Sequence, residues 1–180
     1  MCGIYGTTIH YEDHQLKAKL ERTQFRGPDK TDFKSYSFNN SKVSFGHNRL
    51  SILDLDPRSN QPFNYIDKLE IVFNGEIYNF IELKEELKQK GYKFTTTSDT
   101  EVICAAYLEF GSKCVDKLNG MFAFVIYDIS NQLFFGARDR LGQKPFYYFH
   151  DNNNFEFASQ ISSIQLFNKN LSISRKAITN

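Results

Sequence analysis

The second residue of the chain, Cys2, is the first side chain with a chemistry of its own. If Met1 is removed, one residue presents a thiol and a free α-amine, which are a nucleophile and a base within reach of each other. A neutral thiol is a weak nucleophile, and an α-amine has a pKa that suits a general base at neutral pH. Residues 4–9 read as a strand that would hold this terminus in place. The pattern predicts an N-terminal nucleophile, and from this residue alone a cysteine without a role is an equal alternative.

Asn74 and Gly75 follow a short apolar run at residues 69–73. Asn-Gly is a common two-residue hairpin turn, but here the chain leads into a helix that starts at Asn79 and not into a returning strand. The alternative is an oxyanion hole, in which the Asn74 amide and the Gly75 N–H point at one developing negative oxygen. Gly75 has no side chain to obstruct a substrate, which suits that use.

Two charged residues could hold the ends of a small polar substrate. Arg49 has a planar fork of donors that suits a carboxylate, although a lone arginine near a strand is more often a surface charge. Asp99 follows Ser98 at a predicted helix start, where the helix dipole stabilises an acid whatever its function, so capping is favoured from this residue alone. Pairing with a substrate ammonium is the alternative. We expect His47 to be structural, because Cys2 would carry its own base.

The segment 138–145 connects two predicted strands and combines basic residues with Asp139. Its basic residues could hold a phosphate, but a turn of mixed charge at a partner surface is the favoured interpretation. Residues 26–29 read as a turn with no assigned reaction. No Cys or His pair has zinc spacing, and no Gly-rich phosphate loop is present, so the sequence predicts neither a metal centre nor a P-loop.

The elements that must position these residues are strands around two central helices. One helix is predicted from Asn79 to Gly91 and one from Ser98 to Gly111, each with a Glu at the capping-box position, and a weaker one at 14–24. Further strands are predicted at 33–38, 69–73, 121–127, 132–137, 145–149 and 154–158, the last three at hairpin spacing. This pattern favours layered α+β sheets with helices on their outer faces and does not choose the topology.

Composition limits the class of protein. The 22 basic and 21 acidic residues give no electrostatic footprint for nucleic acid or an anionic membrane. The 18 Phe and 10 Tyr lie in strand-like runs and suit a core. No apolar stretch is long enough to span a bilayer. Three cysteines, Cys2, Cys104 and Cys114, argue against a disulfide scaffold, so we expect a cytoplasmic protein with neither nucleic-acid nor membrane partner.

Seven blocks of the sequence, taken in order, resemble the glutaminase domain of asparagine synthetases, a class II glutamine amidotransferase of the N-terminal-nucleophile hydrolase superfamily. The blocks are Met1-Cys2-Gly3-Ile4, Arg26-Gly27-Pro28-Asp29, Arg49-Leu50-Ser51-Ile52, Asn74-Gly75-Glu76-Ile77-Tyr78-Asn79, Ser98-Asp99-Thr100-Glu101, Gly120-Met121-Phe122-Ala123-Phe124 and Arg138-Asp139-Arg140-Leu141-Gly142. Amidotransferase domains of the glucosamine-phosphate synthase or purine-pathway type are rivals. The third and the last block favour the asparagine-synthetase branch.

The resemblance implies an α+β fold, a four-layer α/β/β/α sandwich of two mostly antiparallel sheets, with the nucleophile at the start of a strand. It assigns the catalytic roles to Cys2, as a nucleophile with its α-amine as base, and to Asn74 and Gly75, as the oxyanion hole. Glutamine would be hydrolysed to glutamate and ammonia through a glutamyl thioester.

The resemblance also implies how glutamine is bound. Arg49, assisted by backbone groups around Leu50 and Ile52, would bind the carboxylate, and Glu76 with Asp99 would hold the α-ammonium. Asp99 thus changes from an expected cap to an expected ligand.

Two residues depart from the family pattern in a loop expected to close over glutamine. Phe25 stands where the family usually has His, and Asp32 where it tends to have Gly. These departures bear on loop closure and on the affinity for glutamine.

The resemblance covers residues 1–165, and we expect residues 166–180 to lead to a synthetase domain that this sequence lacks. That domain would use ATP and magnesium to activate aspartate, so no cofactor is expected in the chain itself. The expected partners are L-glutamine and the synthetase domain, with a homodimer left open. The alternatives are a domain feeding ammonia to a different acceptor and a non-catalytic glutamine-binding or scaffold domain, which retention of Met1 would favour.

Overall fold

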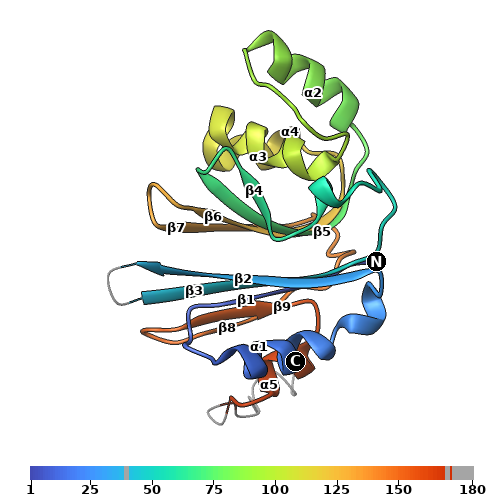
Figure 1. The fold of residues 1–180 in the computed structure, drawn as a ribbon. Helices are drawn as coiled ribbons and strands as arrows, with labels where there is room; N and C mark the ends of the chain where they lie inside the picture. Colours follow the sequence, from blue (N-terminus) through green and yellow to red (C-terminus); the bar gives the residue numbers. More distant parts are fainter. Residues whose placement is uncertain (39–40, 169–170, 172–180) are drawn as a thin grey trace.

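The structure of the chain is a computed structural model that describes residues 1–38, 41–168 and 171. Two antiparallel sheets lie face to face, and helices cover the outer face of each, so that the molecule has four layers (Figure 1). The predicted α+β four-layer sandwich is therefore confirmed. The predicted boundary at residue 165 stays a prediction, because residues 169, 170 and 172–180 lie outside the described residues.

The first sheet has at its centre the strand that begins directly after Cys2. Its strands, in spatial order, are β2 (Lys30–Phe38), β3 (Ser41–Arg49), β1 (Gly3–Thr7), β9 (Phe155–Ala158) and β8 (Tyr147–His150). β1 pairs with β3 on one side and β9 on the other, with Gly3 opposite Asn48 and Tyr5 opposite Ala158. The terminus is thus held by pairing on both sides, and the predicted strand ends two residues early, at Thr7.

The second sheet extends further than its apolar run predicted. Its strands are β4 (Phe63–Tyr65), β5 (Leu69–Ile77), β6 (Gly120–Asp128) and β7 (Leu133–Arg138), in that spatial order. β5 continues past Phe73, with Asn74 opposite Ala123 and Gly75 opposite Phe122. A Cβ on Gly75 would lie 2.3 Å from the carbonyl oxygen of Met121. The Asn-Gly pair is therefore part of a strand that approaches its neighbour closely, and not a hairpin turn.

One prediction about strand pairing was wrong. The strands at 132–137 and 145–149 have hairpin spacing, but β7 is the edge of the second sheet and β8 the edge of the first. The segment between them crosses from one sheet to the other, while the hairpins that do form are those of β6 with β7 and of β8 with β9. Spacing alone cannot distinguish a hairpin from a crossover of similar length.

Aromatic and aliphatic side chains fill the space between the two sheets. This core includes Ile4, Val43, Phe45, Val72, Ala123, Val125, Tyr127 and Phe157, all buried. Rings from both sheets meet in it; those of Phe45 and Phe134 lie 5.9 Å apart. The high aromatic content of the chain therefore serves a core, as its strand-like runs predicted.

Helices pack on both outer faces (Figure 1). The second sheet carries α2 (Phe80–Gln89), α3 (Asp99–Phe110) and α4 (Cys114–Lys117), and the first carries α1 (Asp13–Glu21) and α5 (Ile161–Gln165). Three short 3₁₀ turns complete the description: η1 (Gln24–Arg26), η2 (Pro57–Ser59) and η3 (Gly111–Lys113). Both predicted central helices are confirmed.

Neither of the capping boxes predicted for α2 and α3 is formed, although Ser98 alone caps α3. Ser98 caps α3 by accepting a hydrogen bond from the backbone N–H of Thr100, at 3.1 Å. The carboxylate of Glu101 does not return to Ser98 but accepts hydrogen bonds from the backbone and side chains of Thr95 and Thr96. Asn79 does not cap α2 at all. Its amide is bonded to the backbone at residues 117 and 119 instead, because tertiary contacts compete for the same polar atoms.

Candidate functional site

One pocket lies where β1 begins and where β3 and β5 end. Its volume is about 120 Å³, which suits a small molecule better than a nucleotide or a polymer. All eight site residues assigned by the resemblance line it: Cys2, Arg49, Leu50, Ile52, Asn74, Gly75, Glu76 and Asp99. These residues come from both sheets, from α3 and from the loop after β3, and the most distant pair, Cys2 and Asp99, is 97 positions apart in sequence.

The thiol of Cys2 lies against the backbone of Leu50. Its Sγ is 3.7 Å from the Leu50 carbonyl oxygen, to which it donates, and 3.4 Å from the Leu50 nitrogen, from which it accepts. Burial raises the pKa of the Cys2 thiol, against the effect of the Leu50 hydrogen bond. The resting group is therefore a neutral thiol, which needs a base before it can attack. In the chain as it stands, the nitrogen of Cys2 is in a peptide bond with Met1.

Arg26 approaches the same terminus from η1. Its Nε donates to the carbonyl oxygen of Cys2 at 3.0 Å. The preceding residue, Phe25, is 72% exposed, and Asp32 is exposed on β2, where its carboxylate accepts from the N–H of Phe33. Neither of the two residues that depart from the family pattern lines the pocket.

Asn74 contributes a buried amide that no described residue satisfies. It is 1% exposed, and neither its Nδ2 nor its Oδ1 has a hydrogen-bond partner among the described residues. A buried polar atom without a partner costs about 1–3 kcal/mol, so such groups are rare and call for an explanation. Asn74 lies beside Gly75 in the lining of the pocket. A ligand oxygen would satisfy the Asn74 donor, as an oxyanion hole requires.

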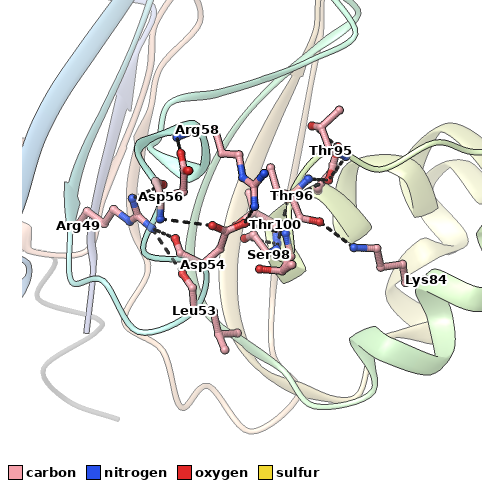
Figure 2. Close-up of polar contacts among 12 residues, drawn as sticks. Arg49, Leu53, Asp54, Asp56, Arg58, Lys84, Thr95, Thr96, Ser98 and Thr100 are labelled. Carbon is pink, nitrogen blue, oxygen red and sulfur yellow. Dashed lines mark hydrogen bonds and ion pairs between the residues drawn. The ribbon is translucent and has the colours of Figure 1, made fainter.

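Arg49 is less free than its sequence context predicted. One terminal nitrogen donates to the Asp56 carbonyl at 3.2 Å and to Asn60 Oδ1 at 2.6 Å; the other donates to the carbonyls of Leu53, at 3.4 Å, and Asp54 (Figure 2). The guanidinium has four terminal N–H groups and the loop 53–60 offers four acceptors, so within the part of the chain that the structure describes only Nε–H is uncommitted. Arg49 is therefore held rigidly, and it is buried rather than on the surface.

Asp54 connects this loop to the segment that precedes α3. Its carboxylate accepts from the backbone N–H of Thr97 at 2.6 Å and from Arg58 at 3.4 Å, and Figure 2 shows the connection. Burial opposes ionisation, but hydrogen bonds from Thr97 and Ser59 and the charge of Arg58 outweigh it and lower the pKa of Asp54 to about 2. The loop that holds Arg49 is thus tied to the helix start that presents Asp99.

Asp99 and Glu76 both bring a carboxyl group to the lining of the pocket. Asp99 is 4% exposed and accepts from the N–H of Ile77 at 3.0 Å. Burial raises the pKa of Asp99 to about 6, and the charge of Glu76 acts in the same direction, although hydrogen bonds from Ile77 and Thr100 oppose both. When two neighbouring carboxylates repel each other enough to raise the pKa of one, a cation placed near them is bound favourably.

His47 has the structural role that we expected. It is buried, its Nε2 lies 3.2 Å from the carbonyl oxygen of Phe73, and burial lowers its pKa to about 3. A ring that stays neutral throughout the physiological range does not act as an acid there.

Two residues of the lining were not singled out from the sequence. Gln61 accepts from the N–H of Phe73 at 2.6 Å and donates to Thr100 Oγ1 at 3.3 Å, which joins β5 to α3 next to the site. Lys144, which is 4% exposed, reaches the pocket from the segment that crosses between the sheets. The sequence marked that segment as unusual, but nothing in it indicated where a single lysine would point.

Metal ligands and membrane spans were sought in the described part of the chain. No group of three or more His, Cys, Asp or Glu side chains within it could hold a metal ion. No helix within residues 1–38, 41–168 and 171 is both long and apolar enough to cross a membrane.

Comparison with solved structures identifies the fold. Glutamine phosphoribosylpyrophosphate amidotransferase from Bacillus subtilis superposes with a TM-score of 0.75 at 22% identity, covering 92% of this chain and 43% of that one. At this identity the likeness shows the fold alone, the four-layer sandwich of two antiparallel sheets.

Comparison of sequences is more specific. Asparagine synthetase [glutamine-hydrolyzing] 1 of Bacillus subtilis is 39% identical over 186 residues, covering 99% of this chain and 29% of that protein. A putative asparagine synthetase [glutamine-hydrolyzing] 2 of Methanocaldococcus jannaschii is 38% identical over 200 residues, covering 99% and 38%. The chain thus spans less than two fifths of the length of these relatives. A family model for the glutamine amidotransferase domain matches residues 1–180. The chain belongs to the glutamine amidotransferase domain family.

Proposed function

We propose that this chain carries the glutaminase half-reaction of a glutamine-hydrolysing asparagine synthetase, with Cys2 as the nucleophile. The observation that carries the proposal is the unpartnered amide of Asn74 beside Gly75, in the same small pocket as the Cys2 thiol. A nucleophile and a waiting oxyanion donor at one cavity are the two parts that acyl transfer from an amide needs.

In the proposed reaction Met1 has been removed and the α-amine of Cys2 takes the thiol proton. Sγ then attacks the side-chain amide carbon of glutamine, and the carbonyl oxygen becomes an oxyanion that accepts hydrogen bonds from Asn74 Nδ2 and the N–H of Gly75. As the tetrahedral intermediate collapses, the α-ammonium of Cys2 returns its proton to the leaving nitrogen, and ammonia departs. The product of this step is a glutamyl thioester.

A water molecule completes the turnover. The α-amine of Cys2 accepts a proton from the water as the water oxygen attacks the thioester carbon, again with the oxyanion at Asn74 and Gly75. Cleavage of the carbon–sulfur bond releases glutamate, and the proton returns to the thiol. Burial raises the pKa of the Cys2 thiol, so the thiol is not ionised in advance. This supports a mechanism in which the base acts during each attack.

The α-amino-acid end of glutamine would lie between Arg49 and the two carboxylates. Glu76 and Asp99 would hold the ammonium, and the carboxylate would be bound by Arg49 with backbone groups around Leu50 and Ile52. Because the loop 53–60 already occupies the terminal nitrogens of Arg49, the carboxylate would take Nε–H or displace one carbonyl of the loop.

In the whole protein, ammonia would pass to a synthetase domain that amidates aspartate with ATP and magnesium. The length of the relatives, of which this chain covers 29% and 38%, supports a further domain as the partner. The acceptor, the boundary near residue 165 and a cytoplasmic location are parts of the same proposal. An acceptor other than aspartate would show itself as amide formation from another carboxylic acid in the full-length protein.

Intact mass, measured before and after treatment with an electrophilic glutamine analogue such as a diazo-ketone, tests the nucleophile. We expect loss of Met1 and one adduct on Cys2, prevented by excess glutamine. Cys104 and Cys114 serve as internal controls, since both are buried and should stay unmodified. The variant Cys2→Ala should neither take up the analogue nor release ammonia from glutamine. Retained Met1, or alkylation of Cys2 that glutamine does not prevent, would contradict the proposal.

A further inference from the structure

Lys144 is a buried cation that the proposed reaction does not use. It is 4% exposed and lines the pocket together with Cys2 and Glu76. Among the described residues its ammonium has one hydrogen-bond partner, the sulfur of Met1 at 3.3 Å, and no ion pair. Burying an ammonium without a carboxylate or a set of oxygen acceptors is costly, so its position needs a reason.

The segment that carries Lys144 is built to hold its backbone in place. Arg138 donates from Nε to the carbonyl oxygen of Lys144 at 2.6 Å, and the Asp139 carboxylate accepts from the Lys144 N–H at 3.0 Å. Asp139 also exchanges backbone and side-chain hydrogen bonds with Phe122 on β6, the residue opposite Gly75. Arg138 and Asp139 therefore fix the backbone carbonyl and the backbone N–H of Lys144 relative to β5, the strand that carries Asn74 and Gly75.

A second cation faces the same terminus. Arg26 donates from Nε to the Cys2 carbonyl at 3.0 Å, and its NH2 group is buried with no partner among the described residues. Burial lowers the pKa of the present N-terminal amine, on Met1; the charges of Arg26 and Lys144 lower it further, whereas those of Cys2 and Asp29 raise it.

Both positively and negatively charged groups lie near Lys144. Burial lowers the pKa of Lys144, and the charge of Arg26 does so too, whereas those of Asp139, Cys2 and Glu76 raise it. Asp139 is committed to the backbone N–H groups of Phe122, Gln143 and Lys144, and the charge of Glu76 acts on Asp99 as well as on Lys144. No acidic side chain in the described residues therefore pairs directly with the Lys144 ammonium.

We propose that Lys144 is a positioning residue whose ammonium, fixed by Arg138 and Asp139, faces the α-amine of Cys2 once Met1 is gone and keeps that amine uncharged. The inference rests on the proposed function of Cys2. Removal of Met1 takes away the sulfur that Lys144 contacts and leaves a new amine at the same end of the pocket. A cation beside an amine disfavours its protonated form, and only the free base can take the thiol proton. The same cation attracts the thiolate that results.

The pH profile of kcat/KM for glutamine hydrolysis by the processed protein tests this inference. In Lys144→Met we expect the midpoint of the acidic limb to move upward by about one pH unit, the usual size of the effect of one close charge. Lys144→Arg keeps the charge and should keep the midpoint within about 0.3 pH unit, a small part of such an effect. Lys113→Met is the matched control, since Lys113 is exposed outside the pocket and should leave the profile unchanged.

A direct titration separates this inference from the proposed function. The ¹⁵N chemical shift of the Cys2 α-amine, followed against pH, should give a higher midpoint in Lys144→Met than in the unaltered protein, whether or not glutamine is hydrolysed. An unchanged amine titration in Lys144→Met would overturn the inference. A loss of activity that is equal at every pH would also overturn it, because Lys144 would then support the fold. A raised KM with an unchanged midpoint of the acidic limb would do the same, because Lys144 would then bind the substrate. Absence of hydrolysis in the unaltered protein, with a shifted titration, would overturn the glutaminase proposal alone.

Discussion

At the end of the pocket that holds Arg49, each terminal N–H of the guanidinium already donates to the loop 53–60. At the end that holds Cys2, the Asn74 amide has no partner within the described residues and Lys144 contacts one sulfur atom. At the first end, the terminal nitrogens of Arg49 are satisfied by the loop before any substrate arrives. The second end has donors and a cation left over for groups that appear only during the reaction. Such a division is what differential stabilisation of a transition state requires.

Removing the Asn74 amide should have the largest effect of the changes considered, because it takes away the donor left without a partner among the described residues at the Cys2 end of the pocket. We expect Asn74→Ala to lower kcat for glutamine hydrolysis by about 100- to 1,000-fold, the usual cost of one lost oxyanion-hole donor, with little change in KM. Steady-state kinetics of the processed protein measure both. Asn152→Ala, at an exposed turn between β8 and β9, is the control. A normal kcat in Asn74→Ala would remove the oxyanion-hole assignment.

Weakening the Arg49 end of the pocket should instead affect the binding of glutamine. In Arg49→Lys the planar fork is lost, so the loop 53–60 and the substrate carboxylate both lose donors, and we expect KM to rise by about 10- to 100-fold with a smaller change in kcat. Equilibrium binding of glutamine to an inactive Cys2→Ala protein gives the same comparison without turnover. If glutamine binds Arg49→Lys as tightly as the unaltered protein, the carboxylate is recognised elsewhere.

Acid should weaken the binding of glutamine by protonating Asp99. Its pKa is raised from 3.8 to about 6, so it becomes protonated as pH falls through that value and its attraction for an ammonium is lost. We expect KM to rise below about pH 6, by up to about tenfold per pH unit. Asp99→Asn should give a high KM that no longer depends on pH in this range. A KM independent of pH between pH 5 and pH 7 in the unaltered protein would argue against an ionised Asp99 as the ligand.

The same shift affects the stability of the unliganded protein in the opposite sense. A carboxyl group whose pKa is raised in the folded state binds more protons there than in the unfolded chain. Its stabilising contribution is complete below pH 3.8 and is lost as pH rises through about 6. Thermal unfolding of the unaltered protein and Asp99→Asn, at pH 5 and pH 7, would show this difference.

The smallest expected effect concerns the connection between the loop and the helix start. Asp54→Ala removes the acceptor for Thr97, and within the loop Arg58 and the Asp56 N–H lose the same carboxylate. We expect KM to rise by about three- to tenfold, the equivalent of the one hydrogen bond lost to the helix start, while kcat stays nearly constant. Asp56→Ala is the matched control, because its side chain bonds only to Arg58 within the loop while its carbonyl still meets Arg49. Equal effects of the two variants would mean that the loop as a whole matters and the Asp54 connection does not.

Local patterns predicted much of the fold because local physics decides those features. Both central helices follow from apolar spacing and the stops at Gly91 and Gly111, and the central strand after Cys2 follows from its β-branched run. The capping boxes are not formed, although Ser98 caps α3, since Asn79 and Glu101 are bonded to segments that the helix pattern does not include. The pairing of β7 and β8 was wrong, because a strand's partner depends on sheet packing and not on the distance to the next strand.

The sequence by itself determined the kinds of chemistry available here: a second-position thiol, an Asn-Gly pair, an arginine and two acids in an order that resembles one family. Only the tertiary structure decided how these groups are satisfied. It occupies the terminal nitrogens of Arg49 and leaves the Asn74 amide without a partner among the described residues. It also brings Lys144 to Met1, 143 residues away. These relations arise where strands of two sheets end at one cavity, and burial there is set by long-range packing that no local spacing encodes.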